Sequence, residues 1–254
     1  MPPKPLTDRP GIREPATLEG RLVRLEPMSL DHLDPLAQVA FDETLWRWTP
    51  DRLMDHDALR GWMTRAIASR AAGTELPFVT VVRRSGRAIG SSRFLNMELA
   101  HRRLEIGWTW IAPAWQRSGA NREAKLLMLG HAFERLGCQR VEFKTDARNE
   151  ASRAALLAIG ATFEGIFRKH MVMPTGRIRD SAYYSITDDE WPAVRTALAA
   201  ATPASGAKAA RASLASLGQP GRPIRRPAGP AVLPCPARTG WPPAPSAPPA
   251  TRRP

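Results

Sequence analysis

Residues 102–122 read RRLEIGWTWIAPAWQRSGANR, and this stretch decides the fold. Its first half, 102–111, is rich in apolar, aromatic and β-branched residues and predicts a strand. The following residues, 113–121, contain proline and glycine and predict a tight turn. The next segment, REAKLLMLGHAFERL (122–136), is typical of an amphipathic helix, with its apolar stripe formed by Leu126, Leu129, Phe133 and Leu136.

A glycine-containing turn that leads into a helix is a potential anion site. The first amides of a helix have no intrahelical acceptor, and the helix dipole favours negative charge at that end. Gly119 allows the backbone to approach a phosphate closely, and Arg117 and Arg122 add positive charge. The turn lacks the Lys-Ser/Thr of a P-loop and the three glycines of a dinucleotide motif. Taken alone, the turn is more typical of an ordinary strand-to-helix connection.

The rest of the chain alternates between the two kinds of periodicity. Strands are expected at 21–28, 78–84, 87–97, 102–111, 140–146, 161–173 and 179–186, with a turn at 85–86. Helices are expected at 29–41, 55–72, 122–136, 149–160 and 187–200. This order predicts an α/β (α+β) fold with a mixed, mostly antiparallel sheet, a central βαβ crossover and flanking helices.

The two ends of the chain differ in composition from this central part. Residues 1–16 are rich in proline and are expected to be loose, and 17–199 are expected to form one domain. Residues 200–254 are mainly Ala, Pro, Gly, Ser and Arg and have no hydrophobic periodicity, so we expect a disordered tail. Eight of the 13 net positive charges lie beyond residue 200, which leaves +5 for the remainder. A mildly basic body suits a phosphate-bearing cofactor, and it is equally typical of a soluble protein surface.

Several classes of protein do not fit this sequence. No apolar run is long enough to cross a membrane, and the N-terminus lacks the apolar stretch of a secretory signal. The two cysteines, Cys138 and Cys235, are too few for a disulfide scaffold and suit the cytoplasm. The five histidines show no paired ligand spacing, so no metal site is expected.

Several motifs, in order, resemble the GNAT superfamily of N-acetyltransferases, in the branch of the RimJ/RimL-type ribosomal-protein acetyltransferases. They are LEGRLVRLEPMSLDHLDPL, LEIGWTWIAPAWQ, QRSGAN, RVEFKTDARNEASRAALLAIGATFEG and RDSAYYSITDDEWPAV, within about 17–199. The resemblance implies the GNAT fold and acetyl-coenzyme A as cosubstrate. The family pattern in the turn is Gln/Arg-x-x-Gly-x-Gly/Ala, which Gln116 and Gly119 match, whereas Asn121 replaces the usual Gly or Ala.

The resemblance also implies which residues bind coenzyme A. Backbone amides of the turn would bind the diphosphate, the backbone at the end of the preceding strand would lie beside the thioester, and an Asn-x-x-Ser pattern would flank the pantetheine arm. The cofactor-binding residues implied in this way are Trp110, Ile111, Gln116, Arg117, Ser118, Gly119, Ala120, Asn121, Arg122, Asn149 and Ser152.

Two side chains are candidates for the proton transfers that acetyl transfer requires. Glu105 lies mid-strand, is expected to share a face with Gly107, Thr109 and Ile111, and matches the carboxylate that several members use as a base through water. A solvated or ion-paired strand glutamate explains it equally well. Ser152 matches the residue that protonates the leaving sulfur. Asn149 is also a natural N-cap, with Ser152 then merely filling the first turn.

Aromatic residues mark a possible acceptor site. Trp46 and Trp48 lie in a loop of the kind that covers the acceptor in this branch, although such residues more often belong to a core. At least one of Tyr183 and Tyr184 is expected to point into the core.

The acceptor is expected to be a primary amine, either a protein N-terminal α-amine or a small-molecule amine. An α-amine needs little help, because its pKa of about 7.7–8.0 leaves much of it neutral near pH 7.4, whereas a lysine needs a strong base. Two alternatives stay open. One is a catalytically silent acetyl-coenzyme A sensor, and the other, less favoured, is a nucleic-acid-binding protein acting through its basic tail. Either a monomer or a homodimer is compatible with the sequence.

Overall fold

The eight strands form a single sheet. The computed structural model describes residues 16–202. The predicted loose segment 1–16, apart from its last residue, and the predicted tail beyond residue 202 lie outside the described residues. The strands are β1 (Leu18–Glu19), β2 (Val23–Pro27), β3 (Leu76–Val82), β4 (Ala88–Glu98), β5 (Arg103–Ile111), β6 (Arg140–Asp146), β7 (Thr162–Val172) and β8 (Ile178–Thr187). Their order in the sheet is β1-β2-β3-β4-β5-β6-β8-β7.

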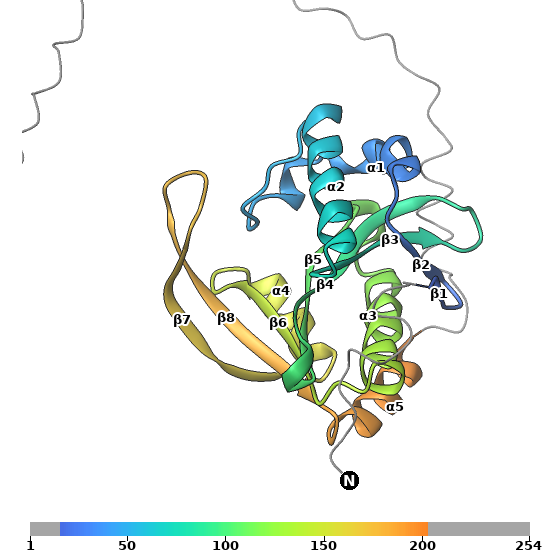
Figure 1. Ribbon diagram of the computed structural model, residues 1–254, viewed down its shortest axis with the longest axis vertical. Helices are drawn as coiled ribbons and strands as arrows, with labels where there is room; N and C mark the ends of the chain where they lie inside the picture. The colour runs from blue at the N-terminus through green and yellow to red at the C-terminus, as the bar shows by residue number, and fades with distance from the viewer. Residues whose placement is uncertain (1–15, 203–254) are drawn as a thin grey trace, which may run out of the picture. The chain divides into compact units, whose positions relative to one another are not determined.

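Five α-helices flank the sheet (Figure 1). They are α1 (Leu33–Ala40), α2 (His56–Ala71), α3 (Ala120–Gly130), α4 (Glu150–Ala158) and α5 (Trp191–Ala201). Strands β5 and β6 are parallel and are joined through α3, and every other pair in the sheet is antiparallel. The predicted mixed α/β fold with a central βαβ crossover is therefore confirmed.

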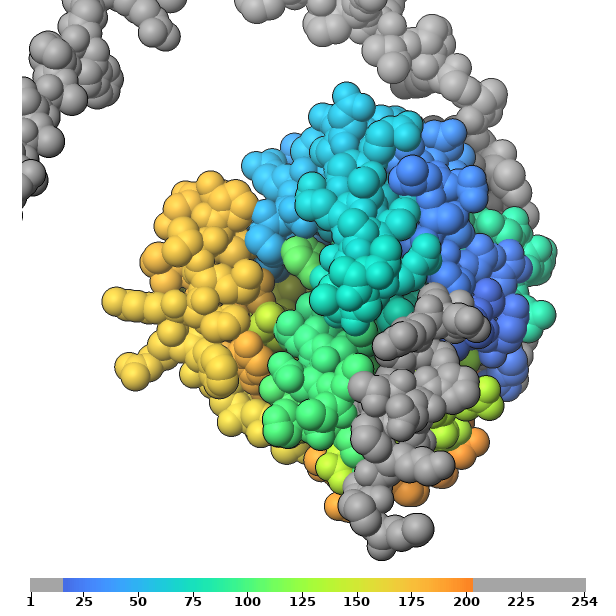
Figure 2. Space-filling view, viewed as in Figure 1, coloured from blue at the N-terminus to red at the C-terminus, as the bar shows by residue number. Residues whose placement is uncertain are grey.

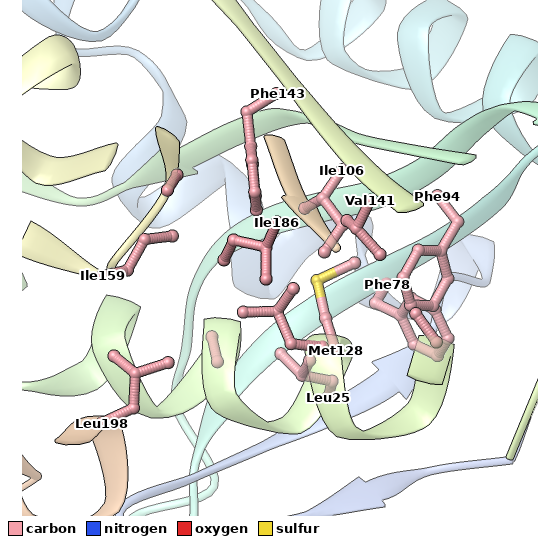
Figure 3. Close-up of a cluster of buried hydrophobic side chains, with 14 of the residues drawn as sticks. Leu25, Phe78, Phe94, Ile106, Met128, Val141, Phe143, Ile159, Ile186 and Leu198 are labelled. Atoms are coloured by element: carbon pink, nitrogen blue, oxygen red, sulfur yellow. The ribbon is translucent and has the colours of Figure 1, made fainter. Parts of the chain in front are cut away.

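Two apolar cores lie on opposite faces of the sheet. The larger one packs α3 and α5 against the strands, with Met128 of α3 and Leu198 of α5 among its members (Figure 3). The second packs α1 and α2 against β3 and the end of β5. Leu59 and Trp62 supply its α2 side. Burial on both faces explains why β3 is buried along its whole length.

Some element boundaries differ from the sequence prediction. Ser29 opens a 3-10 turn, and with His32 it forms a capping box, so α1 itself begins at Leu33. The predicted helix 122–136 starts at Ala120 and changes to a π-helical turn over His131–Arg135. The expected apolar stripe is also only partly correct, because Leu126 is half-buried whereas Glu123 and Lys125 are buried.

Glu123 ties α3 to the beginning of the sheet. Its carboxylate accepts hydrogen bonds from the backbone amides of Arg21, Leu22 and Val23, at 2.9, 2.6 and 2.8 Å. Gly20 makes this possible, because a Cβ there would lie 2.8 Å from the carboxylate. Three donors satisfy the buried charge, and the start of α3 is held against the β1–β2 turn.

We predict that Gly90→Ala is strongly destabilising, by at least about 2 kcal/mol of unfolding free energy, because the added Cβ would lie 2.1 Å from the carbonyl oxygen of Trp110 on the neighbouring strand. Gly61→Ala is the matched control. Its Cβ would meet nothing closer than 3.6 Å, inside α2, so it should stabilise by about 0.5–1 kcal/mol. Urea unfolding measures both, and equal stability of the two variants would contradict the close approach of β4 and β5.

Candidate active site

The parallel strands β5 and β6 separate after three residue pairs. Arg103, Leu104 and Glu105 pair with Arg140, Val141 and Glu142, and the ladder then ends. Strand β6 nevertheless continues to Asp146 in register with β8, and β5 continues to Ile111 beside β4. A gap therefore opens between the two strands, with backbone groups of β5 facing it.

A β-bulge in β5 changes which side chains face the gap and the cores. Gly107 pairs with Arg93 and Trp110 with Ser91, so β5 has one extra residue, and Trp108 adopts a φ of 49°. The bulge reverses the alternation of side chains. The expected common face of Glu105 with Thr109 and Ile111 is therefore wrong. Ile111 packs in the larger core on the opposite side, and Trp110 packs in the α1–α2 core.

The turn that follows β5 has a tight, left-handed geometry. Arg117 has a φ of 58° and Gly119 a φ of 95°, and α3 begins at Ala120. The buried hydroxyl of Ser118 donates to the carbonyl of Trp115 at 2.6 Å and accepts from the amide of Ala120 at 3.3 Å. By helix geometry the next two amides, at 121 and 122, have no intrahelical acceptor. The turn thus presents main-chain donors suited to an anion.

Two side chains of this turn make contacts elsewhere, and a third has a buried atom without a partner. The Gln116 amide donates to the carbonyl of Ile111 at 3.1 Å and so fixes the turn to the end of β5. Arg122 donates to the carbonyl of Ala201 at 2.7 Å, at the end of α5. The Oδ1 atom of Asn121 is buried and has no hydrogen-bond partner among the described residues.

Helix α4 begins on the other side of the gap, just after β6. Asn149 is its N-cap and accepts from the amide of Ser152 at 3.1 Å, so the capping role of Asn149 is confirmed. Ser152 is half-buried in the first turn. The two predicted groups of cofactor residues, one after β5 and one after β6, are therefore brought to the same end of the gap.

Glu105 lies where the ladder ends, and its side chain is only 3% exposed. Its Oε2 accepts from Asn96 at 2.9 Å and from Lys144 at 3.4 Å. Its Oε1 lies over Gly107, since a Cβ there would be 3.1 Å from it. One carboxylate oxygen is thus engaged by donors, and the other points along β5 at the first residues that have left β6.

His170 and Tyr183 are within electrostatic reach of this carboxylate. One of the two tyrosines was expected in the core, and it is Tyr184 that is buried there, whereas sequence reasoning assigned His170 no role. The Tyr183 hydroxyl and His170 Nε2 are 3.3 Å apart, and His170 Nδ1 is 3.0 Å from the Ser181 hydroxyl. Partial burial, together with Lys144 and Arg179, lowers the pKa of His170, which keeps the imidazole neutral at pH 7. Burial and the charge of Glu105 raise the pKa of Tyr183. Because the three groups come from β5, β7 and β8, no local sequence pattern could link them.

A buried lysine reaches the bulge from α3. Lys125 Nζ donates to the hydroxyls of Thr109, at 2.6 Å, and Ser92, at 3.2 Å. No carboxylate of the described residues lies within ion-pair distance of it, and burial lowers its pKa to about 7. Lys125 thereby connects the helix that follows the turn to the bulged part of β5.

The loop 43–52 lies beside the tip of the β7–β8 hairpin (Figure 2), and of the two predicted acceptor aromatics only Trp46 borders the cavity of about 370 Å³ between these segments. Trp46 is mainly a core residue, because it is buried and its Nε1 donates to the carbonyl of Ala40 at 2.7 Å. An edge of Trp46 lines the cavity. Trp48 is half-buried and does not line it, although Arg47 and Arg177 lie over its ring.

The walls of this cavity contact both separated strands. Trp46 packs edge-to-face against Trp110 of β5, with 5.4 Å between ring centroids. Arg177, at the hairpin tip, forms an ion pair of 2.5 Å with Asp146 at the end of β6. The cavity is therefore anchored to the same ends of β5 and β6 as the gap.

Residues 22–162 match the family described as the acetyltransferase (GNAT) domain. The chain belongs to the GNAT acetyltransferase family. This family uses acetyl-coenzyme A. Among the described residues, no helix is long and apolar enough to span a membrane.

Solved GNAT structures share the fold over most of the described chain. A GCN5-related N-acetyltransferase from Brucella melitensis is 32% identical, with a TM-score of 0.71, over 75% of this chain and 87% of that one. RimJ from Mycobacterium smegmatis, solved with coenzyme A disulfide, is 25% identical, with a TM-score of 0.65, over 74% of this chain and 96% of that one.

Two curated Bacillus subtilis proteins are similar over a shorter stretch. "Putative ribosomal N-acetyltransferase YdaF" is 33% identical over 42% of this chain, and "Uncharacterized N-acetyltransferase YoaA" is 35% identical over 39%. The matches span 57% and 54% of these relatives, a little over half of their length.

The buried lysine makes stability depend on pH. Since the pKa of Lys125 falls from 10.5 to about 7 on folding, the unfolded chain binds one more proton between these values. Burial of Lys125 should therefore cost roughly 5 kcal/mol of unfolding free energy below pH 7. This cost should shrink as the pH rises from 7 to 10.5, so the stability of the protein should increase over that range. We predict that Lys125→Met removes this slope and is more stable than the wild type at pH 6.5. Urea unfolding across this range measures it, and parallel pH profiles for the two proteins would contradict a neutral Lys125.

Proposed function

We propose that this protein transfers an acetyl group from acetyl-coenzyme A to a primary amine, which is either a protein N-terminal α-amine or a small-molecule amine. The observation that carries the proposal is the separation of β5 from β6 after three residue pairs. The anion-binding turn lies at the end of β5, the start of α4 follows β6, and a cavity adjoins both.

The proposed cofactor contacts come mainly from the backbone. The amides of 118–122 would bind the diphosphate of coenzyme A, with Arg117 beside them. The backbone of Trp110 and Ile111 would lie along the pantetheine arm, since this edge of β5 has no strand partner. Gln116 would hold the turn in place through Ile111, and Asn149 would face the arm from the other side.

The proposed chemistry needs one base and one acid. The amine nitrogen bonds to the acetyl carbon, the carbon–sulfur bond breaks, the amine loses a proton and the sulfur gains one. Glu105 is the proposed base, acting through water, because its Oε1 points along the unpaired part of β5. Ser152 is the proposed donor to sulfur. Its hydroxyl makes no hydrogen bond within the described part of the chain and lies next to Asn149, at the start of α4.

The first experiment measures binding and turnover separately in the full-length protein. Isothermal titration with coenzyme A tests the cofactor site, and thiol release from acetyl-coenzyme A tests transfer to a panel of peptides and amines. Binding and transfer are both expected. Binding without transfer to any amine would favour the sensor, and absence of binding would overturn the proposal. Salt-dependent binding to nucleic acid, lost on deleting 201–254, would support the alternative role of the tail.

We predict that Glu105→Gln lowers kcat/KM at pH 7 by about 100-fold, the usual size of a general-base contribution. The loss should shrink above pH 9, because the amine then deprotonates without help. Glu98→Gln is the control, since Glu98 is exposed in the same region of the sheet. A loss that stays constant with pH would assign Glu105 a structural role instead.

We predict that Ser152→Ala lowers kcat by about tenfold or more and leaves the Kd for coenzyme A within about twofold, because the hydroxyl acts on the leaving sulfur and not on the diphosphate. Rapid-mixing kinetics and calorimetry give the two numbers. Equal losses in turnover and in cofactor affinity would reduce Ser152 to a scaffold residue in the first turn of α4.

A further inference from the structure

The cavity between loop 43–52 and the β7–β8 hairpin tip has a strongly basic lining. Arg47, Arg52 and Arg177 contribute to it, and Glu43 is its one carboxylate. Arg177 is already neutralised by Asp146. Within residues 16–202, neither Arg47 nor Arg52 has a carboxylate within ion-pair distance, and Arg47 is held over the ring of Trp48 at 5.0 Å. Two guanidinium groups are therefore available to a ligand.

The neighbouring carboxylates are engaged elsewhere. Asp42 accepts from the amide and hydroxyl of Thr44, and Asp51 pairs with Arg65 at 3.6 Å. The positive charge of the lining is therefore not cancelled from the loop itself, and Glu43 offsets only part of it.

A further guanidinium, that of Arg179, contacts the backbone of Trp48. Arg179 is buried, and it donates to the carbonyl of Trp48 at 3.4 Å and to the hydroxyl of Ser181 at 3.1 Å. Burial lowers its pKa, and the charge of Asp146 offsets this in part. Because the charge of this buried cation is only partly balanced, a further negative group nearby would be stabilised.

We infer that this cavity selects acceptors that carry a carboxylate close to the primary amine that is acetylated. This inference rests on the proposed function and names its substrate class. Arginine binds carboxylates in a bidentate manner, so Arg47 and Arg52 would hold this group while the amine reaches the gap. Polycationic acceptors such as polyamines would be repelled by the same lining.

The basic lining also favours the reactive form of the acceptor. Nearby positive charges disfavour an ammonium ion, so they lower the pKa of the bound amine and increase its neutral fraction. The carboxylate of the acceptor supplies the attraction that the cationic amine would otherwise lack. Positive charge at this site therefore assists both selection and deprotonation.

The test compares matched acceptors on the full-length protein. The tetrapeptide amides Ser-Glu-Ala-Ala, Ser-Gln-Ala-Ala and Ser-Lys-Ala-Ala differ only in the charge of the second side chain, which is negative, neutral or positive. Comparison of free serine with serinamide tests a small-molecule acceptor that carries the carboxylate. We expect kcat/KM for the acidic member of at least one set to exceed that of its neutral partner by about tenfold, falling as salt is raised. A preference among the tetrapeptides would identify a peptide as the acceptor, and a preference for serine over serinamide would identify a free amino acid.

The double variant Arg47→Gln/Arg52→Gln should remove this preference, because it should raise KM for the acidic acceptor far more than KM for the neutral acceptor. Arg84→Gln, on the exposed β3–β4 turn, is the control and should retain the preference.

Equal kcat/KM for acidic, neutral and basic acceptors would overturn the inference while leaving acetyl transfer intact. A weaker Kd for coenzyme A in the double variant would also overturn it, because the arginines would then serve the cofactor. Loss of transfer to every acceptor in the wild type would instead refute the proposed function.

Discussion

The early separation of two parallel strands is the constraint on which the rest of this site depends. If β5 and β6 remained paired beyond Glu105 and Glu142, their backbone groups would satisfy one another and leave no gap. Because they separate, the turn after β5 and the start of α4 after β6 face a common space. The full pairing of β6 with β8 and the bulged pairing of β5 with β4 hold the two strands apart.

Three buried polar groups take part in holding the elements that flank this gap. Glu123 holds the start of α3 through three backbone amides, and Lys125 holds the bulge of β5 through two hydroxyls. Glu105 is held by Asn96 and Lys144. Such groups cost stability when they are buried, and the two apolar cores on opposite faces of the sheet offset that cost. The fold thus accepts a local penalty where a cofactor and an acceptor are proposed to meet.

The acceptor side is built from loops that depend on the same two strands. Trp46 packs on Trp110 of β5, and Arg177 pairs with Asp146 of β6, so a shift of either strand would also move the cavity. Membership of the GNAT family implies acetyl-coenzyme A as the cosubstrate. The basic lining of the cavity is the basis for the proposed acidic acceptor, because neither Arg47 nor Arg52 has a carboxylate of the described residues within ion-pair distance.

The sequence alone determined the order of the helices and of all strands except the two-residue β1, the glycine turn at Gly119 and the cap at Asn149, because these follow from local periodicity and backbone preferences. It could not determine the bulge in β5, which reversed the predicted face of Thr109 and Ile111, since one extra residue in a ladder is defined by the partner strand. Only the tertiary structure brought Glu105, His170 and Tyr183 together and buried Lys125. These contacts join distant strands and helices, and no spacing along the chain records them.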